Sequence, residues 1–395
     1  MKDFLEEAAK MEKEAISLRR KFHENAELGL NEISTSKIII EYLKKQGIPY
    51  YTCGKTGVVG LIKGSKISEK IPKVIALRAD MDALPILEEN NVSYKSKNIG
   101  IMHACGHDAH MAILLIAAKI LKDHSSEFSG FVKLIFEPAE ETIGGSRMMI
   151  EEGVLENPHV NAVFGLHVTE NLETNKIMVR KKYINAASNP FKISIIGKGA
   201  HGATPDISID PIVVAAEIIM AFQTISSRKI SPKNPVVVTV GSINGGSAKN
   251  VIPKEVTLSG IIRTTNNNDR KISKESLYNI ATYIAKAHGA TVKIEIEEGY
   301  PSLYNDEKMC DRLINSAKKI IGSNNVLYQR EISMGVESFA YFASKVPGCF
   351  YYVGTGNSKK NTTKPAHSSK FNIDEEALKI GIAIQCQVAY DFLEE

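Results

Sequence analysis

Short apolar segments alternate with helical segments in the N-terminal part of this 395-residue chain, and polar residues follow several of the apolar segments. The pattern predicts strands at 58–62, 73–78, 130–136 and 162–166, and helices at 34–46, 109–122 and 146–152. Such alternation is typical of an α/β sheet, in which functional side chains gather at the carboxyl edge of the strands. We therefore expect an α/β fold with its site along that edge.

A second pattern begins near residue 185. It predicts a strand at 191–196, a helix at 211–226, strands at 236–240 and 256–262, a helix at 273–288 and a strand at 291–296. This β-α-β-β-α-β order is the ferredoxin-like one. Because the chain is long for a single core, we expect a discontinuous larger domain at 1–184 and 301–395, interrupted by a small α+β domain at 185–300.

Composition argues against several classes of protein. Apolar residues make up 43% and charged residues 24% of the chain, and the net charge of +4 comes without a dense basic block. We expect no nucleic-acid partner and, because no apolar run is long enough to span a bilayer, no membrane partner. The start lacks the features of a signal peptide, and five scattered cysteines suit a reducing compartment, so the expected location is cytoplasmic.

Metal-ligating side chains occur in three motifs and one later segment. The motifs are Cys-Gly-His-Asp at 105–108, Pro-Ala-Glu-Glu at 138–141 and Gly-Leu-His at 165–167, and the later segment holds His367. On an extended segment, Glu140 and Glu141 would point to opposite sides, so that one could bind metal while the other handles a proton. Zinc- and manganese-like ions need three to five ligands and an open position for water. The joint placement predicts a metal-dependent hydrolase.

Each of these residues also has an ordinary structural interpretation. A single cysteine is usually a small buried apolar group. A single histidine usually makes a hydrogen bond in the core or at the surface, and a pair of glutamates usually lies on a solvated face. We prefer the metal site because every member of the set follows a strand or opens a loop.

Five segments resemble the M20 metallopeptidase family, in order and over nearly the whole chain. They are Arg-Arg-Lys-Phe-His at 19–23, Leu-Arg-Ala-Asp-Met-Asp-Ala-Leu-Pro at 77–85, Met-His-Ala-Cys-Gly-His-Asp-Ala-His at 102–110, and the motifs at 138–141 and 165–167. Within the family they resemble the amidohydrolase subgroup, which includes N-acyl-amino-acid hydrolases, hippurate hydrolase, auxin-conjugate hydrolases and N-acetyldiaminopimelate deacetylase. The resemblance implies a zinc-peptidase-like catalytic domain with a mixed sheet flanked by helices, a dinuclear metal site, and a small lid that mediates dimerisation.

The resemblance also implies roles for individual residues. The metal ligands would be Cys105, His107, Glu141, His167 and His367. Glu140 would be the general base that activates a water and then protonates the leaving nitrogen, and Asp82 would orient and polarise a site imidazole, or else cap a turn as a loop carboxylate. Two divalent ions per subunit are expected, manganese or zinc first, with nickel and cobalt as further options. A thiolate ligand favours zinc on grounds of softness.

The chain departs from the wider family at Asp80-Met81-Asp82, where the peptidase branches carry His-x-Asp. The missing imidazole is consistent with a site rebuilt around Cys105 and His107. We interpret Asp80 as structural, and His110 as a residue that packs in the core or beside the ligands.

Segment 197–202, Gly-Lys-Gly-Ala-His-Gly, matches the dinucleotide fingerprint GxGxxG. The helix that should begin within the glycines resumes only near residue 211, which argues against a nicotinamide enzyme. By resemblance, His201 donates a hydrogen bond to the scissile carbonyl oxygen, within the subunit or across a dimer interface, and Asn250 and Arg263 contact the substrate carboxylate. The ordinary alternatives are a turn residue for Asn250 and a strand-end cation for Arg263.

We expect a metal-dependent amidohydrolase that acts on a small-molecule N-acyl amino acid, with an acetyl or aromatic acyl group, and that forms a homodimer through the lid. The alternatives are a dipeptidase or aminopeptidase of the same superfamily, and a metal-binding protein without turnover. The retention of Glu140 beside Glu141 argues against the last of these. No spacing rule determines the acyl group.

Overall fold

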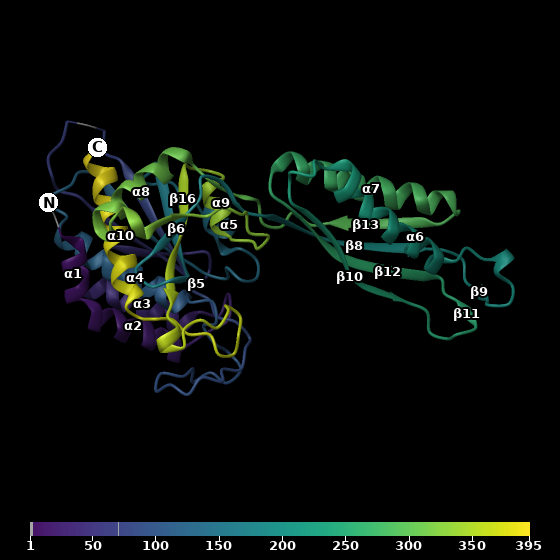
Figure 1. Ribbon diagram of the computed structural model, residues 1–395, viewed down its shortest axis with the longest axis horizontal. Helices are drawn as coiled ribbons and strands as arrows, with labels where there is room; N and C mark the ends of the chain where they lie inside the picture. Colours follow the sequence, from purple (N-terminus) through teal and green to yellow (C-terminus); the bar gives the residue numbers. More distant parts are fainter. Residues whose placement is uncertain (1–2, 70) are drawn as a thin grey trace. The chain divides into compact units, whose positions relative to one another are not determined.

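The computed structural model describes residues 3–69 and 71–395, which divide into two compact units (Figure 1). Unit 1 comprises the chain up to Lys182, Tyr304–Arg330 and Glu337–Glu395, and unit 2 comprises Tyr183–Leu303 and Glu331–Val336. Unit 2 thus begins at 183 where the sequence indicated 185, and its main segment ends at 303 where the sequence indicated 300. Segment 331–336 was not expected in it. This segment groups with unit 2 because the carbonyl of Ser333 accepts the N–H of Ala186 at 2.9 Å.

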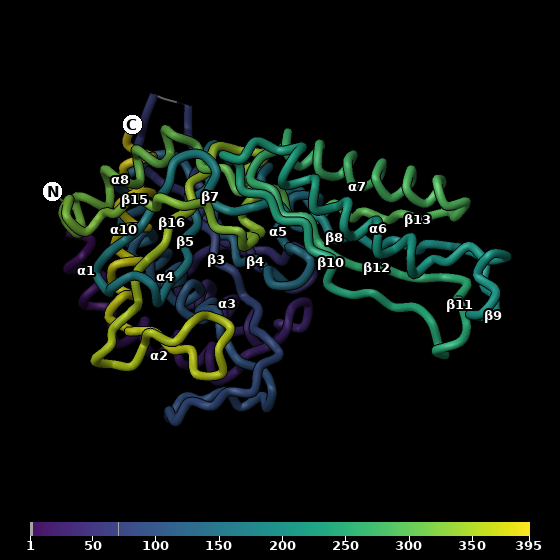
Figure 2. The backbone as a smooth tube through the Cα atoms, turned by 45° about the vertical axis from the view of Figure 1, so that its right-hand side comes forward, coloured from purple at the N-terminus to yellow at the C-terminus, as the bar shows by residue number. Residues whose placement is uncertain are grey.

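An eight-stranded mixed sheet forms the centre of unit 1, in the order β1-β2-β4-β3-β5-β16-β6-β15. Its strands are β1 (Tyr50–Cys53), β2 (Gly57–Lys63), β3 (Val74–Asp80), β4 (Phe131–Glu137), β5 (Ala162–Glu173), β6 (Ile177–Val179), β15 (Val326–Tyr328) and β16 (Gly348–Gly356). The neighbours β4, β3, β5 and β16 run parallel to one another and can be followed in Figure 2. Their carboxyl ends therefore meet at one edge, and the predicted α/β architecture is confirmed.

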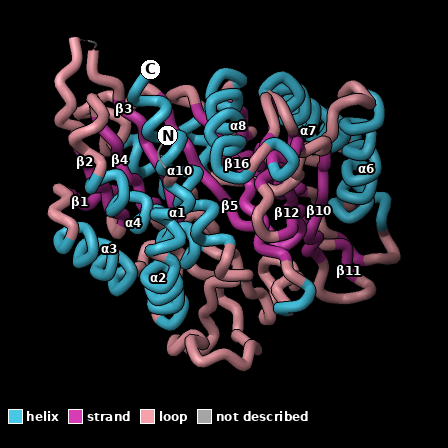
Figure 3. The backbone as a smooth tube through the Cα atoms, turned by 60° about the vertical axis from the view of Figure 1, so that its left-hand side comes forward, coloured by secondary structure: helices cyan, strands magenta, loops and turns pink. Residues whose placement is uncertain are grey.

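Helices cover both faces of this sheet, and Figure 3 shows the larger layer over the strands. The larger layer consists of α1 (Phe4–Lys10), α2 (Glu12–Glu24), α3 (Ile33–Lys45), α4 (His107–Asp123), α8 (Glu307–Ile321) and α10 (Ala377–Glu394). The smaller layer consists of α5 (Gly145–Glu151) and α9 (Phe339–Ala343). In the larger layer α4 and α10 approach closely, since a Cβ at Gly381 would lie 2.7 Å from Cδ1 of Ile113. Within the described part of the chain, every helix is too short or too polar to cross a membrane.

Strand β3 carries charge into the core of unit 1. Its seven residues, Val-Ile-Ala-Leu-Arg-Ala-Asp, are all buried, as is usual for a central parallel strand with helices on both faces. Two of the seven, Arg78 and Asp80, are ionisable and lie near the carboxyl end. Buried charges require partners, so this edge of the sheet must gather further polar residues.

Unit 2 contains a four-stranded antiparallel sheet in the order β10-β12-β8-β13, with two helices on one face (Figure 1). Its elements are β8 (Ala187–Ile196), β9 (Ala200–His201), α6 (Pro211–Thr224), β10 (Val236–Gly245), β11 (Val251–Ile252), β12 (Glu255–Thr264), α7 (Asn267–Ala287) and β13 (Thr291–Ile296). The main elements follow the expected β-α-β-β-α-β order. The short strands β9 and β11 pair as a ribbon beyond one end of the sheet, and β7 (Lys182–Asn185) pairs with β14 (Leu303–Asn305).

Single turns complete the secondary structure. They are 3-10 turns at Pro205–Ile207, Ser323–Asn325 and Ser358–Lys360, and a π turn at Ile225–Lys229 that extends α6. No helix begins within the glycines of segment 197–202 in the described chain, so this loop does not have the geometry of a dinucleotide turn.

Candidate active site

The segment that carries Cys105 and His107 turns sharply into helix α4. Gly106 has a backbone φ of +85°, which side chains rarely adopt, and a Cβ there would lie 2.3 Å from Cγ2 of Val168. Cys105 precedes this glycine, and His107 is the first residue of α4. The turn therefore places a thiol and an imidazole beside strand β5.

Backbone carbonyls set the tautomers of two imidazoles near the thiol. Nδ1 of His107 donates to the carbonyl of Asp82 at 2.8 Å, and Nδ1 of His167 donates to the carbonyl of Val168 at 2.6 Å. In the neutral form of each ring, Nε2 then carries the lone pair, and Nε2 of His167 lies 3.3 Å from Sγ of Cys105. Metal-binding histidines are commonly oriented by such hydrogen bonds. His167 lies within β5, not at its end, because the strand continues beyond it.

Glu141 and His367 form the second part of the site. Nε2 of His367 lies 3.2 Å from Oε1 of Glu141. The backbone N–H of His367 donates to the carbonyl of Ala104 at 2.8 Å, and the residue has a φ of +65°. The loop near the C-terminus is thereby held against the turn that carries Cys105.

Two sets of candidate ligands share Cys105. One contains His107 and His167, the other Glu141 and His367, and within each set the ligand atoms lie within 4.8 Å of one another. Oε1 of Glu141 is buried, and Nε2 of His367 lies 3.2 Å from it. A buried carboxylate needs a cation beside it, and a metal ion held by these ligand atoms would supply one. The residues present therefore fit two divalent ions.

The carboxylate of Asp82 caps a turn, which was the ordinary alternative for this residue. Its carboxylate accepts the backbone N–H of Glu140 at 2.9 Å and that of Glu141 at 3.1 Å. Nδ1 of His107 donates to the main-chain carbonyl of Asp82, and the carboxylate lies farther from this nitrogen, at 3.5 Å. Asp82 thus orients the imidazole with its main chain and fixes the two glutamates with its side chain.

Glu140 and Glu141 do not lie on an extended segment, and the expectation from strand alternation is wrong. Strand β4 ends at Glu137, and both residues lie in a turn that follows Ala139, whose φ is +53°. The turn is held by long-range hydrogen bonds that the local sequence does not reveal. The two side chains therefore occupy different surroundings because of the turn.

The carboxyl groups of the two glutamates differ in environment. Oε1 of Glu140 accepts the N–H of Ser338 at 3.0 Å, and burial together with the carboxylates of Glu337 and Glu141 raises its pKa well above the ordinary value. Burial alone would also raise the pKa of Glu141, but its interaction with His367 lowers it. Adjacent carboxyl groups whose pKa values move apart are typical of a pair with separate roles.

A buried guanidinium lies beneath this pair. Arg78 donates to the carboxylates of Glu137 at 2.7 Å and Asp80 at 2.8 Å, and to the hydroxyl of Ser338 at 2.9 Å. Glu337 lies 3.1 Å from the same guanidinium. Sequence reasoning missed these roles, and the available signal was a charged residue in the apolar run 73–78.

Asp80 and His110 support the site from the core, in agreement with their structural interpretation. Nδ1 of His110 donates to Asp80 at 2.6 Å, and its Nε2 accepts the N–H of Val168 at 2.9 Å. Burial alone would raise the pKa of Asp80, but the imidazole of His107 and the guanidinium of Arg78 hold it well below the ordinary value. Both ring nitrogens of His110 are thus engaged within the protein.

The three lid candidates lie at two ends of the unit 2 sheet. His201 and Asn250 are exposed on the ribbon of β9 and β11, where Gly202 donates to the carbonyl of Asn250 at 2.8 Å (Figure 1). Arg263 lies near the opposite end of β12. Arg263 is eight residue steps along β12 from Glu255, where the strand begins near the ribbon, and this is roughly 26 Å at strand spacing. One copy of unit 2 therefore does not bring the three residues together.

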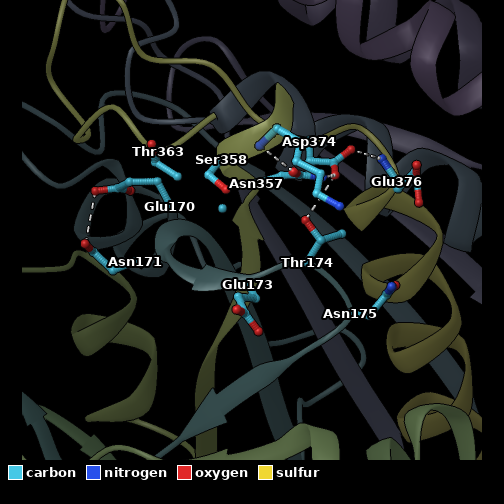
Figure 4. A pocket seen from close by; sticks show the side chains of 12 residues that line it. Glu170, Asn171, Glu173, Thr174, Asn175, Asn357, Ser358, Thr363, Asp374 and Glu376 are labelled. Carbon is cyan, nitrogen blue, oxygen red and sulfur yellow. Dashed lines mark hydrogen bonds between the residues drawn. The ribbon is translucent and has the colours of Figure 1, made fainter. Parts of the chain in front are cut away.

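A separate pocket of about 520 Å³ lies in unit 1 beside the last residues of strand β5 (Figure 4). Polar residues line it, among them Glu170, Thr174, Asn357 and Asp374. The carboxylate of Asp374 accepts from Asn357 at 2.7 Å, Thr174 at 3.2 Å and Lys360 at 2.8 Å. The hydrogen-bonding capacity of the Asp374 carboxylate is therefore satisfied by protein groups. None of the residues that line this pocket belongs to the two ligand sets.

The parallel sheet and the ligand sets at its carboxyl edge define a metal-dependent hydrolase. The chain belongs to the peptidase family M20/M25/M40, whose model matches residues 76–391, and the predicted family is confirmed. A solved structure described as a dinuclear metal-binding peptidase of family M20, from Bacillus subtilis, is 34% identical with a TM-score of 0.83 and covers 98% of this chain and 99% of its own.

Curated relatives cover nearly the whole chain. Thermostable carboxypeptidase 2 of Saccharolobus solfataricus is 40% identical over 382 residues, which are 95% of each chain. IAA-amino acid hydrolase ILR1-like 4 of Arabidopsis thaliana is 39% identical and covers 96% of this chain and 86% of its own. Hippurate hydrolase of Campylobacter jejuni is 36% identical and covers 95% of this chain and 96% of its own.

Proposed function

We propose that this protein is a metal-dependent amidohydrolase that cleaves N-acyl amino acids to a carboxylate and a free amino acid. The observation that carries the proposal is that two adjacent carboxylates, close together at the site, have different partners. Glu141 lies beside His367 in the set that contains Cys105. Glu140 also comes within reach of His107 and Glu141, but one of its carboxylate oxygens accepts a hydrogen bond from Ser338. A hydrolase needs both a ligand and a proton carrier at one place, and this turn provides them.

Cys105, His107, Glu141, His167 and His367 would hold two divalent ions. Manganese and zinc are the first candidates, with nickel and cobalt as further options, and the thiol of Cys105 favours zinc. When bound, the ions would polarise the substrate carbonyl and lower the pKa of a water molecule. The five side chains supply a thiol, three imidazoles and a carboxylate, which is a donor set suited to such ions.

Glu140 would carry the proton. Its carboxylate accepts a proton from water as the water oxygen attacks the carbonyl carbon, and it returns the proton to nitrogen as the carbon–nitrogen bond breaks. The hydrogen bond from Ser338 to one carboxylate oxygen restricts rotation of the group. Asp82 adds a second constraint, because it binds the backbone N–H of Glu140 itself.

Unit 1 would be the catalytic domain and unit 2 a lid that contacts the substrate. The separation of His201 and Asn250 from Arg263, roughly 26 Å along β12, exceeds the length of an N-acyl amino acid. If all three contact one substrate, two copies of the chain must contribute, and we therefore propose a homodimer through the lid. Edge strand β10, largely exposed along its length, supports such an interface.

Arg263 suits the substrate carboxylate. Its Nη1 is buried and makes no hydrogen bond within the described residues, so the group can accept an anion. Hippurate hydrolase and IAA-amino acid hydrolase are named for N-acyl amino acids, and a carboxypeptidase also releases an amino acid that bears a free carboxylate. The shared chemistry is an amide whose nitrogen belongs to an amino acid. Carboxypeptidase activity is accordingly the second candidate.

A thiol ligand also bears on location. Cys105 would be oxidised in an oxidising compartment, so we place the enzyme in the cytoplasm.

The test is amine release by metal-free protein reloaded with zinc, manganese, nickel or cobalt. The panel contains N-benzoyl, N-acetyl and indole-acetyl amino acids, N-blocked dipeptides and free dipeptides. Metal-dependent cleavage of the N-acyl amino acids supports the proposal. Cleavage restricted to N-blocked dipeptides moves the enzyme to carboxypeptidases, and dependence on a free α-amine moves it to dipeptidases or aminopeptidases. Bound metal without turnover of any substrate would favour a non-catalytic role.

A further inference from the structure

Three consecutive backbone N–H groups in the turn after β4 are accepted by buried carboxylates. Glu32 accepts the N–H of Ala139 at 2.8 Å, and Asp82 accepts those of Glu140 and Glu141 at 2.9 and 3.1 Å. Glu32 comes from the start of helix α3, far from the site in sequence. We infer that Glu32 is a positioning residue, which fixes the Ala139 conformation from which the side chains of Glu140 and Glu141 are directed to the site. This inference rests on the proposed function.

Ala139 needs an external partner to keep its conformation. Its φ of +53° lies in the left-handed region, which is unfavourable for a residue with a Cβ. The residue is fully buried, so water cannot satisfy its N–H in place of Glu32. The segment of this chain that contains Gly29 also packs closely here, since a Cβ at Gly29 would lie 3.0 Å from Ala139. The hydrogen bond from Ala139 to Glu32 therefore stabilises this backbone state, together with the bond from the N–H of Gly144 to the carbonyl of Ala139 at 3.1 Å.

The side chain of Glu32 is committed to this contact. Residues at the start of a helix commonly accept a hydrogen bond from the first turn of their own helix. Glu32 occupies that position before α3, but its side chain makes no such bond. It is fully buried and instead accepts from Ala139 and, at 2.6 Å, from the hydroxyl of Thr56. Each carboxylate oxygen of Glu32 thus accepts one hydrogen bond, and one of the two donors, the N–H of Ala139, immediately precedes the candidate base Glu140.

Loss of this contact would change catalysis more than substrate binding. Without Glu32, rotation of the peptide before Ala139 to an ordinary φ becomes favourable in free energy. The side chains of Glu140 and Glu141 then change direction. A displacement of about 1 Å at a catalytic group can cost about a hundredfold in rate. We therefore expect the loss in kcat, with KM within about twofold of the wild-type value.

The experiment compares Glu32→Asp with Glu32→Gln in the full chain loaded with zinc or manganese. Asp keeps the charge but withdraws the oxygens by about 1.5 Å, the length of one carbon–carbon bond, whereas Gln keeps an acceptor at the right distance. With N-benzoylglycine as substrate, kcat should fall about a hundredfold in the Asp variant and stay within about threefold in the Gln variant. Thr56→Val, which removes only the other contact of Glu32, is the matched control and should retain kcat.

A rescue variant tests the backbone mechanism directly. Glycine adopts positive φ without penalty, so adding Ala139→Gly to Glu32→Asp should restore about tenfold of the lost kcat. Amide hydrogen exchange across 137–142 in metal-free protein gives a readout independent of activity. Exchange should be faster than wild type in the Asp variant and unchanged in the Gln and Thr56→Val variants.

The inference is overturned if the Asp variant is as active as the Gln variant or more active. It is also overturned if exchange across 137–142 is unchanged by Glu32→Asp, or if glycine at 139 restores nothing. A wild-type protein that cleaves no N-acyl amino acid would refute the proposed function instead. The exchange measurement would then decide the role of Glu32 alone.

Discussion

Replacement of Arg78 by methionine tests how strongly the buried charges hold the site together. Methionine is flexible and uncharged and fills the space of the aliphatic stem, so the change removes the charge and five donors together with the volume of the guanidinium end. The guanidinium is completely buried and contacts three carboxylates, those of Asp80, Glu137 and Glu337, and the hydroxyl of Ser338. All three acids would remain in the core without their shared cation.

The expected loss follows from these contacts. Removal of one partner from a buried ion pair costs about 3–5 kcal/mol, because the other charge stays desolvated. Asp80 retains its contact with His110, and Glu137 retains the N–H of Ser146 and the hydroxyl of Ser338. We therefore expect the free energy of unfolding of unit 1 to decrease by an amount within this range and not by more. Arg78→Lys keeps the charge but loses the planar fork, and loss of one charge-assisted bond would cost about 1.5–3 kcal/mol.

Urea unfolding of chelator-treated protein at pH 7.5 measures this effect without a contribution from metal binding. The chain has no tryptophan and 14 tyrosines, so tyrosine fluorescence and far-ultraviolet circular dichroism report the transitions. The expected order of stability is wild type, then Arg78→Lys, then Arg78→Met. A loss below about 1 kcal/mol for methionine, or equal losses for both variants, would refute the reasoning, since exposed ion pairs behave in that way.

Four further substitutions test the site itself. Glu140→Gln should lower kcat by a factor of about 10²–10⁴ with metal content unchanged, whereas Glu141→Gln should lower metal content first, as measured by atomic absorption; the opposite pattern would exchange the two roles. Cys105→Ala should reduce metal stoichiometry, and an unchanged stoichiometry would remove the thiol from the site. Glu337→Gln tests a carboxyl group whose pKa burial raises from 4.5 to about 7. The guanidinium of Arg78 acts against this rise, and the carboxylate of Asp80 adds to it. Because this folded pKa lies above the unfolded one, the carboxyl group favours folding below pH 4.5, and this contribution is lost as the pH rises through about 7. The thermal midpoint of the metal-free Gln variant should therefore rise relative to that of the wild type as the pH increases from 4.5 to 7. A difference in thermal midpoint that does not change with pH would contradict the assignment.

The fold was largely predictable because periodicity reports local structure. Parallel strands buried on both faces give apolar runs, and amphipathic helices give a repeat near 3.6 residues, so β3, β4 and α4 were expected close to where they occur. Short elements such as β6 and β15 were not expected, because three residues carry too little pattern. Segment 331–336 joined unit 2 only through pairing with residues near 185, which no local signal reports.

The candidate ligands were also predictable, for a related reason. Cys105 and His107 lie on either side of a glycine, and Glu141 follows a strand parallel to the one that holds His167, so topology alone brings them to one edge. His367 was proposed from the family resemblance. Its place depends on a backbone hydrogen bond to Ala104 and on a left-handed φ.

The sequence by itself therefore determined the two-part α/β architecture and the residue types able to bind metal. Only the tertiary structure decided the surroundings of Glu140 and Glu141. The turn that carries them is held by Glu32, 107 residues away from Ala139 in sequence, and Glu140 is held by Ser338, 198 residues away. Buried carboxylates must find donors wherever the folded chain supplies them, and those donors depend on the packing of distant segments.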